Sequence, residues 1–149
     1  MVIRFLIPGR PIPKSRPRFN RGKAHTPART RAYQKFVALC GMQAMAQAGC
    51  TCTGEPVALV VTVLFDRPAK PPKDHPTTGI AQRVPLACAG GYPDLSNVVK
   101  AIEDGLEGIV YKNDSQLWQL QASKWWCAQG EAAGVEVVCY LKEGVPCMN

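Results

Sequence analysis

The chain has 149 residues, 46% of them hydrophobic, which is enough to bury a core and predicts a single domain over residues 1–149. No apolar stretch approaches the roughly 18 residues of a membrane span, and Pro8 and Arg10 interrupt the N-terminus too early for a secretory signal. We therefore expect a cytoplasmic protein that does not enter a membrane, with its seven cysteines reduced.

The charge is distributed unevenly along the chain. Eighteen lysines and arginines against eleven acids give a formal charge of +7. Residues 1–54 contain ten of the basic residues and no acid, whereas residues 94–149 contain eight acids and four lysines. The basic half predicts a polyanionic partner such as nucleic acid, although an ordinary solvated face would give the same pattern.

The N-terminal segment predicts a short strand followed by a basic arm. Residues Val2 to Ile7 alternate in polarity, as a strand does. Residues 8–28 are rich in proline and basic side chains, which excludes a helix and favours an extended arm. The alternative is a flexible linker, but Ile12 and Phe19 give an ordered arm something to dock with. The residues expected to contact phosphates in this arm are Lys14, Arg16, Arg18, Arg21 and Lys23.

A helix and a buried strand follow the arm. The helix starts at Thr26-Pro27 or at Thr30, runs to Ala48 and stops at Gly49. Its residues Tyr33, Phe36, Val37 and Cys40 have helical spacing and are expected to face the core. The β-branched run from Val57 to Phe65 predicts a buried strand.

Residues 66–93 predict a long loop with six prolines, in which Lys73 is a further candidate for nucleic-acid binding and His75 a surface residue. A second helix covers Leu95 to Leu106, because its apolar residues repeat along one face and Gly108 supplies a stop.

Two alternating runs close the chain. One lies around Trp118–Ala122 and is expected to have one buried face, and the other spans Val135–Leu141. Gln129-Gly130 between them favours an antiparallel pair. The predicted fold is α+β in two layers, a small mixed β-sheet with helices on one face, in the order β-α-β-(long loop)-α-β-β.

The second helix gathers candidate site residues: Lys100 and Asp104 are expected to take part in catalysis, and Asn97 is expected to contact nucleic acid. Asn97, Lys100 and Asp104 lie three and four residues apart, opposite the apolar stripe, with Asp94 just before the helix and Asp114 after it. Separately they have ordinary explanations: an N-cap for Asp94, a surface ion pair for Lys100 and Asp104, and a turn for Asp114. Together they favour a site in which Asp94 and Asp114 bind Mg²⁺ and Lys100 offsets charge on a phosphate.

The stretch from Pro93 to Leu106 and the stretch from Gly108 to Gln116 together resemble the central motif of RusA-type Holliday-junction resolvases. The opening residues Ile7–Pro11 and Lys14–Arg18 resemble the N-terminal pattern of that prophage and bacterial family. The resemblance implies Mg²⁺-dependent cleavage of four-way DNA junctions, with Mn²⁺ as a possible substitute, by a homodimer acting in DNA recombination and repair.

The resemblance also implies roles for individual residues. Asp94 and Asp114 would be the metal-binding carboxylates, Lys100 the essential lysine and Asp104 a further acid. Ser96 stands where the family often has a second aspartate, and Asn113 where an acid is often found, so both are candidate accessory residues. Two alternatives stay open at this point: a junction- or duplex-binding protein with weak or no catalysis, and a nuclease that acts on another nucleic acid.

Overall fold

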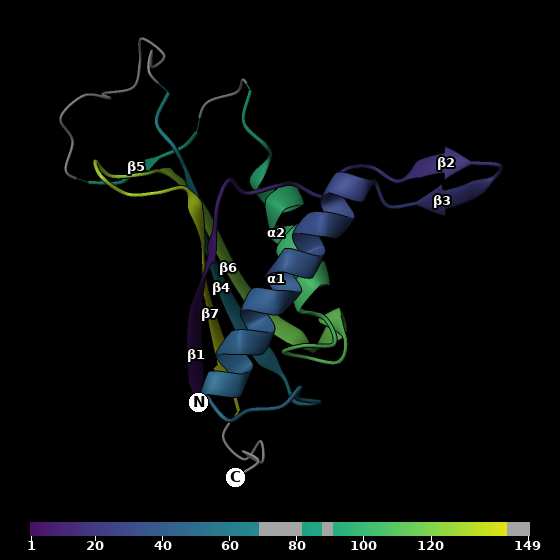
Figure 1. The fold of residues 1–149 in the computed structure, drawn as a ribbon. Coiled ribbons are helices and arrows are strands. Elements are labelled where there is room, and N and C mark those ends of the chain that lie inside the picture. The colour runs from purple at the N-terminus through teal and green to yellow at the C-terminus, as the bar shows by residue number, and fades with distance from the viewer. Residues whose placement is uncertain (69–81, 88–90, 143–149) are drawn as a thin grey trace.

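The computed structural model describes residues 1–68, 82–87 and 91–142. A five-stranded mixed sheet forms one layer and two helices cover one of its faces, which confirms the predicted α+β class (Figure 1). Lys73 and His75 lie outside the described residues. The strands of this sheet are β1 (Val2–Pro8), β4 (Val57–Phe65), β5 (Val84–Pro85), β6 (Leu117–Trp126) and β7 (Gly134–Leu141).

The order of the strands is β1-β7-β4-β6-β5. Strand β4 pairs with β6 in parallel and with β7 in antiparallel orientation, and β1 pairs with β7 in antiparallel orientation. The predicted antiparallel pairing of the last two long strands is therefore wrong, because β4 lies between them. The composition of β4 explains this position: it contains no charged residue and is buried along almost its whole length, as a central strand requires.

Strand β6 differs from expectation in a second way. It pairs with β4 along its length, but on its other side β5 reaches only Trp125 and Trp126. A register shift next to Val57 leaves Trp118 without a partner on β4. Trp118 and Leu120 are 68% and 45% exposed, so the one-buried-face prediction fails for these two residues.

The helices are α1 (Ala28–Gln47) and α2 (Leu95–Leu106), close to the predicted bounds. Tyr33 and Val37 on α1 are buried as expected, but Phe36 is 37% exposed and does not face the core. The helices approach closely at Gly105 of α2, where an added Cβ would lie 2.8 Å from the Val37 side chain. A residue without a side chain is therefore needed at this crossing.

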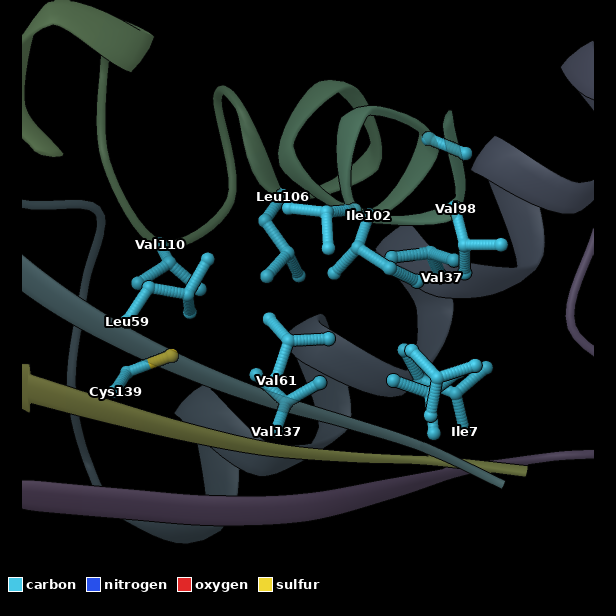
Figure 2. Close-up of a cluster of buried hydrophobic side chains, with 14 of the residues drawn as sticks. Ile7, Val37, Leu59, Val61, Val98, Ile102, Leu106, Val110, Val137 and Cys139 are labelled. Carbon is cyan, nitrogen blue, oxygen red and sulfur yellow. The ribbon is translucent and has the colours of Figure 1, made fainter. Parts of the chain in front are cut away.

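The core fills the space between the sheet and the two helices (Figure 2). Val61 and Val137 rise from neighbouring strands toward Ile102 of α2, with Val37 of α1 beside them. Fixing α2 on the sheet in this way also fixes the direction in which its polar face points. Within the described residues, no helix is long and apolar enough to cross a membrane.

The basic arm forms a β-hairpin that the sequence did not predict. Strands β2 (Arg18–Asn20) and β3 (Lys23–His25) pair in antiparallel orientation and project beyond the end of α1 (Figure 1). Arg21 and Gly22 both have positive φ, 51° and 75°, as a two-residue type I′ turn requires. Ile12 packs against the core as expected, whereas Phe19 is 76% exposed, so the expected docking of Phe19 is wrong.

Candidate active site

Charged side chains meet at the polar face of α2 in a group that we call the acid–lysine cluster. It consists of Lys100 and Asp104 of α2, Lys14 of the basic arm and Asp114 of the segment before β6. Lys100 Nζ lies 3.1 Å from Asp114 Oδ2 and 3.3 Å from Asp104 Oδ1. Lys100 and Asp104 are one helical turn apart and so share a face. The pair Lys100–Asp114 connects α2 to the segment that enters β6, fourteen residues further along the chain.

Lys14 attaches the basic arm to this cluster. Its Nζ donates to Asp104 Oδ2 at 2.6 Å, and its backbone N–H donates to the Asn97 carbonyl at 2.9 Å. Gln34 of α1 donates a further hydrogen bond to Asp104 Oδ2 at 3.3 Å. Asp104 therefore connects the arm, α1 and α2 at a single carboxylate.

The turn that holds Asp114 is fixed by the residues next to it. Asn113 is the N-cap of the short 3₁₀ helix Asp114–Gln116, and its Oδ1 accepts from the Ser115 N–H at 2.9 Å. Gln116 Oε1 accepts in return from the Asn113 N–H at 2.9 Å, which completes a capping box. Gln116 Nε2 also donates to the carbonyl of Thr53 at 3.0 Å. Asn113 thus has a structural function that an acid would also perform.

Asp94 lies at the other end of α2, six residues before Lys100, which corresponds to about 9 Å of helix rise. It occupies the N-cap position, but its side chain makes no capping hydrogen bond. Capping therefore does not account for this carboxylate, which is exposed. Asp94 lines a pocket of about 700 Å³, the Asp94 pocket, formed by Pro13, Lys14, Ser15, Arg16, Tyr92, Pro93, Asp94 and Asn97.

An aromatic group supports the chain just before Asp94. The Tyr92 ring packs edge-on against Phe65 and Trp126, with centroid distances of 5.5 and 6.2 Å. Lys124 of β6 donates to the Pro93 carbonyl at 3.1 Å. These contacts hold the entry to α2 and place a partly buried lysine next to it.

The electrostatics of the cluster keep Lys100 protonated. The hydrogen bond to Asp114 is the largest influence and raises the pKa of Lys100 above its ordinary value of 10.5, against a smaller lowering by burial. Glu103 of α2 has a raised pKa chiefly because it is partly buried. Lys100 is therefore a fixed cation at neutral pH and cannot serve there as a base.

The carboxylates suit a hard divalent cation in chemistry, because Mg²⁺ prefers oxygen ligands and commonly takes one or two from protein. Among the residues that the structure describes, no three histidine, cysteine, aspartate or glutamate side chains come together as a metal site. Asp104 is already bound by two lysines and a glutamine, so Asp94 and Asp114 are the better candidates. Water and phosphate oxygens would complete such a shell.

The structure brings four of the predicted residues into one cluster and places Asp94 and Asn97 in the adjoining pocket. Ser96 is exposed on the first turn of α2. Arg18, Arg21 and Lys23 lie on the hairpin, away from α2.

The sequence did not single out several residues near the site. They are Gln34, Gln116 and Lys124, and also Arg31 and Lys35, which line a second pocket beside Asp104. Of these, Gln116 could have been found from the sequence, because it lies three residues after Asn113, the spacing of a capping box.

Comparison with known proteins adds an independent observation. The family model of the endodeoxyribonuclease RusA matches residues 8–138. The uncharacterized protein YqaN of Bacillus subtilis (strain 168) is 30% identical over 145 residues, which is 91% of this chain and 94% of that protein. The family match extends over every residue predicted for the site.

Proposed function

Because this chain belongs to the RusA endodeoxyribonuclease family, we propose that it is a structure-selective DNA endonuclease that resolves four-way junctions. The observation that carries the proposal is the ion pair between Lys100 and Asp114 within the family match. It joins the two sequence segments in which the family resemblance is strongest. Recombination and repair of DNA are the processes that need such an activity, and a prophage is the proposed source.

A divalent cation, Mg²⁺ or else Mn²⁺, would supply charge neutralisation and an activated water at the scissile phosphate. Asp94 and Asp114 would hold it. Lys100, which stays charged, would stabilise negative charge on the phosphate oxygens as the bond breaks. Asp104 would position Lys100 and Lys14 rather than bind metal, because both lysines donate to it.

Substrate binding is assigned to the basic arm and to the rim of the Asp94 pocket. Arg16 lines that pocket, and Arg18, Arg21 and Lys23 continue the positive charge along the hairpin. Lys14 and Asn97 both line the pocket, and Lys14 also belongs to the cluster. A DNA strand whose phosphates contact the arm would therefore reach Asp94.

We also propose a homodimer. Each chain has one acid–lysine cluster and can nick one strand at a time, whereas resolution needs two matched nicks. Light scattering at micromolar concentration should report twice the mass of one chain. A mixed dimer of wild type and Asp94→Asn should nick one strand of a closed junction without resolving it. A monomeric mass with full paired cleavage would contradict the dimer.

The decisive test is a cleavage assay on a four-way junction, a linear duplex and a single strand, each with and without Mg²⁺. Paired nicks on the junction alone, and only with the metal, are the expected result. Equal cleavage of the linear duplex would instead indicate a general nuclease. Junction binding without cleavage in either Mg²⁺ or Mn²⁺ would contradict the enzyme assignment.

One observation favours a second candidate, a junction-binding protein with weak catalysis. Ser96 is neutral where the family often has a carboxylate, and a hydroxyl is a weaker ligand for a hard cation. Ser96→Asp should then raise nicking at low Mg²⁺, since the side chain is exposed and can accept a carboxylate without repacking. Ser96→Ala is the matched control and should leave the metal dependence unchanged.

A further inference from the structure

Phe19 is the most exposed large apolar side chain among the described residues, at 76%. It lies on β2 of the projecting hairpin, directly opposite Ala24 of β3. Because successive side chains of a strand point to opposite faces, Phe19 and Ala24 share one face of the hairpin. The small Ala24 leaves the aromatic ring uncovered.

The other face of the same hairpin is basic. Arg18 pairs with His25, and Asn20 pairs with Lys23, so these four side chains lie opposite Phe19. All of them are exposed. The hairpin therefore carries hydrogen-bond donors and positive charge on one side and a single aromatic ring on the other.

The backbone of the hairpin is fixed at its turn and near its base. The type I′ turn at Arg21 and Gly22 matches the natural twist of two strands. At the base of the hairpin, the Lys14 N–H donates to Asn97 and the Ser15 N–H donates to Thr30 Oγ1 at 3.3 Å. Phe19 thus stands four residues beyond an anchored backbone, on the same arm that borders the Asp94 pocket.

We propose that Phe19 stacks on a DNA base at the branch point of the junction while the basic face of the hairpin contacts the adjoining phosphates. This inference rests on the proposed function. An exposed aromatic side chain among basic residues is the combination that binds bases whose faces are open, and it does so without sequence preference. A base in the interior of a continuous duplex has no open face, so the contact would favour branched DNA.

A second copy of the chain is a less suitable partner for this hairpin. The chain itself has a net charge of +7, and residues 1–54 contain no acid, so two arms repel one another. DNA offers the hairpin both the opposite charge and the ring faces that Phe19 would cover.

The test compares Phe19→Ala, Phe19→Leu and Phe19→Trp with wild type in buffer without divalent metal, so that binding is measured without cleavage. The probes are a four-way junction and a linear duplex. The fluorescent base 2-aminopurine is placed either at the crossing or in the middle of an arm of the junction, and in the middle of the duplex. Phe19→Ala should weaken junction binding by about 5- to 150-fold, the scale of one lost stacking contact. Duplex binding should change by less than about twofold.

The three substitutions of Phe19 distinguish aromatic stacking from the mere presence of a large apolar side chain. Phe19→Trp should keep junction affinity and the fluorescence change at the crossing, whereas Phe19→Leu should lose both. Arg18→Ala is the matched charge control. It should lower the slope of log affinity against log salt by about 1, and Phe19→Ala should leave that slope unchanged.

Several results would overturn the inference. These are junction affinity unchanged in Phe19→Ala, an equal loss on junction and duplex, or full rescue by Phe19→Leu. A fall in oligomer mass for Phe19→Ala would assign the ring to a second copy instead of DNA. If wild type nicks the junction, any of these results refutes only the stacking of Phe19, and the proposed function stands. If wild type neither binds nor nicks the junction, both this inference and the proposed function fail.

Discussion

Lys14 Nζ lies 2.6 Å from Asp104 Oδ2, although the two residues are ninety positions apart in the chain. The pair attaches the arm that is proposed to bind DNA to the helix that carries the candidate catalytic lysine. Asp104 also pairs with Lys100, so one carboxylate links the arm to the rest of the cluster. Substrate binding and the geometry of the cluster are therefore expected to depend on each other.

The first prediction concerns the strength of this pair. Both side chains are partly exposed, at 32% and 21%, so the ion pair should stabilise the fold by no more than about 1 kcal/mol. A double-mutant cycle of Lys14→Met and Asp104→Asn, measured by urea unfolding, should give a coupling energy of that size. The same cycle measured on nicking rate should give a larger coupling. Equal, near-zero coupling in both would show that the contact has no functional consequence.

The second prediction concerns the two proposed metal-binding carboxylates. Asp94→Asn and Asp114→Asn should each lower nicking by at least about 100-fold, on the scale of removing one electrostatic stabiliser. Junction binding should be retained or tightened, because each change removes a negative charge that repels DNA. Glu55→Gln, an exposed acid outside the cluster, is the control. Near-normal nicking by either aspartate variant in Mg²⁺ would refute the assignment.

The third prediction concerns pH. The pKa of Lys100 is raised in the folded protein by its hydrogen bond to Asp114, so its contribution to stability is complete below the ordinary lysine value of 10.5. That contribution should be lost only as the pH rises through the higher folded-state value. The difference in unfolding free energy between wild type and Lys100→Met should therefore stay constant from about pH 6 to 9. A difference that declines steadily across this range would contradict the charged-lysine assignment.

The fourth prediction concerns the helix crossing. A Cβ at residue 105 would lie 2.8 Å from Val37 side-chain atoms and 3.0 Å from the Gln34 carbonyl oxygen, which cannot easily move. Gly105→Ala should therefore destabilise the fold by about 1–2 kcal/mol in spite of the higher helix propensity of alanine. Gly41→Ala is the matched control, since its nearest neighbour is the flexible end of Leu106. It should cost less, and the reverse ranking in urea unfolding would contradict the packing explanation.

The sequence best predicted those features that are set by residues close together in the chain. The apolar stripe of α2, the stop at Gly108 and the polar face with Lys100 and Asp104 all follow from helical periodicity and agree with the structure. The order of strands could not be predicted in this way, because the choice of the strand beside β7 depends on burial across the whole sheet. Alternation of polarity alone could not show that β4 would separate β6 from β7.

The candidate site divides in the same way. The spacing of Asn97, Lys100 and Asp104 was sufficient to place them on one face of α2. The other two partners of Asp104 were not predictable, since Lys14 and Gln34 come from other elements, ninety and seventy residues away. The exposure of Phe19 also contradicted expectation, because Phe19 was expected to dock the extended arm on the rest of the protein and instead lies on a projecting hairpin.

The pairing of the first strand with the last has a consequence for synthesis of the chain. Residues Val2–Pro8 of β1 pair with Gly134–Tyr140 of β7, and β4 pairs with β6 from Leu117 onward and with β7 from Gly134 onward. During translation the apolar β4 must therefore stay unpaired until its partners β6 (Leu117–Trp126) and β7 (Gly134–Leu141) have been made. Mixed sheets with such distant pairings form slowly and expose aggregation-prone segments while incomplete. We expect yield in a heterologous host to be limited by this interval, and to improve at lower growth temperature.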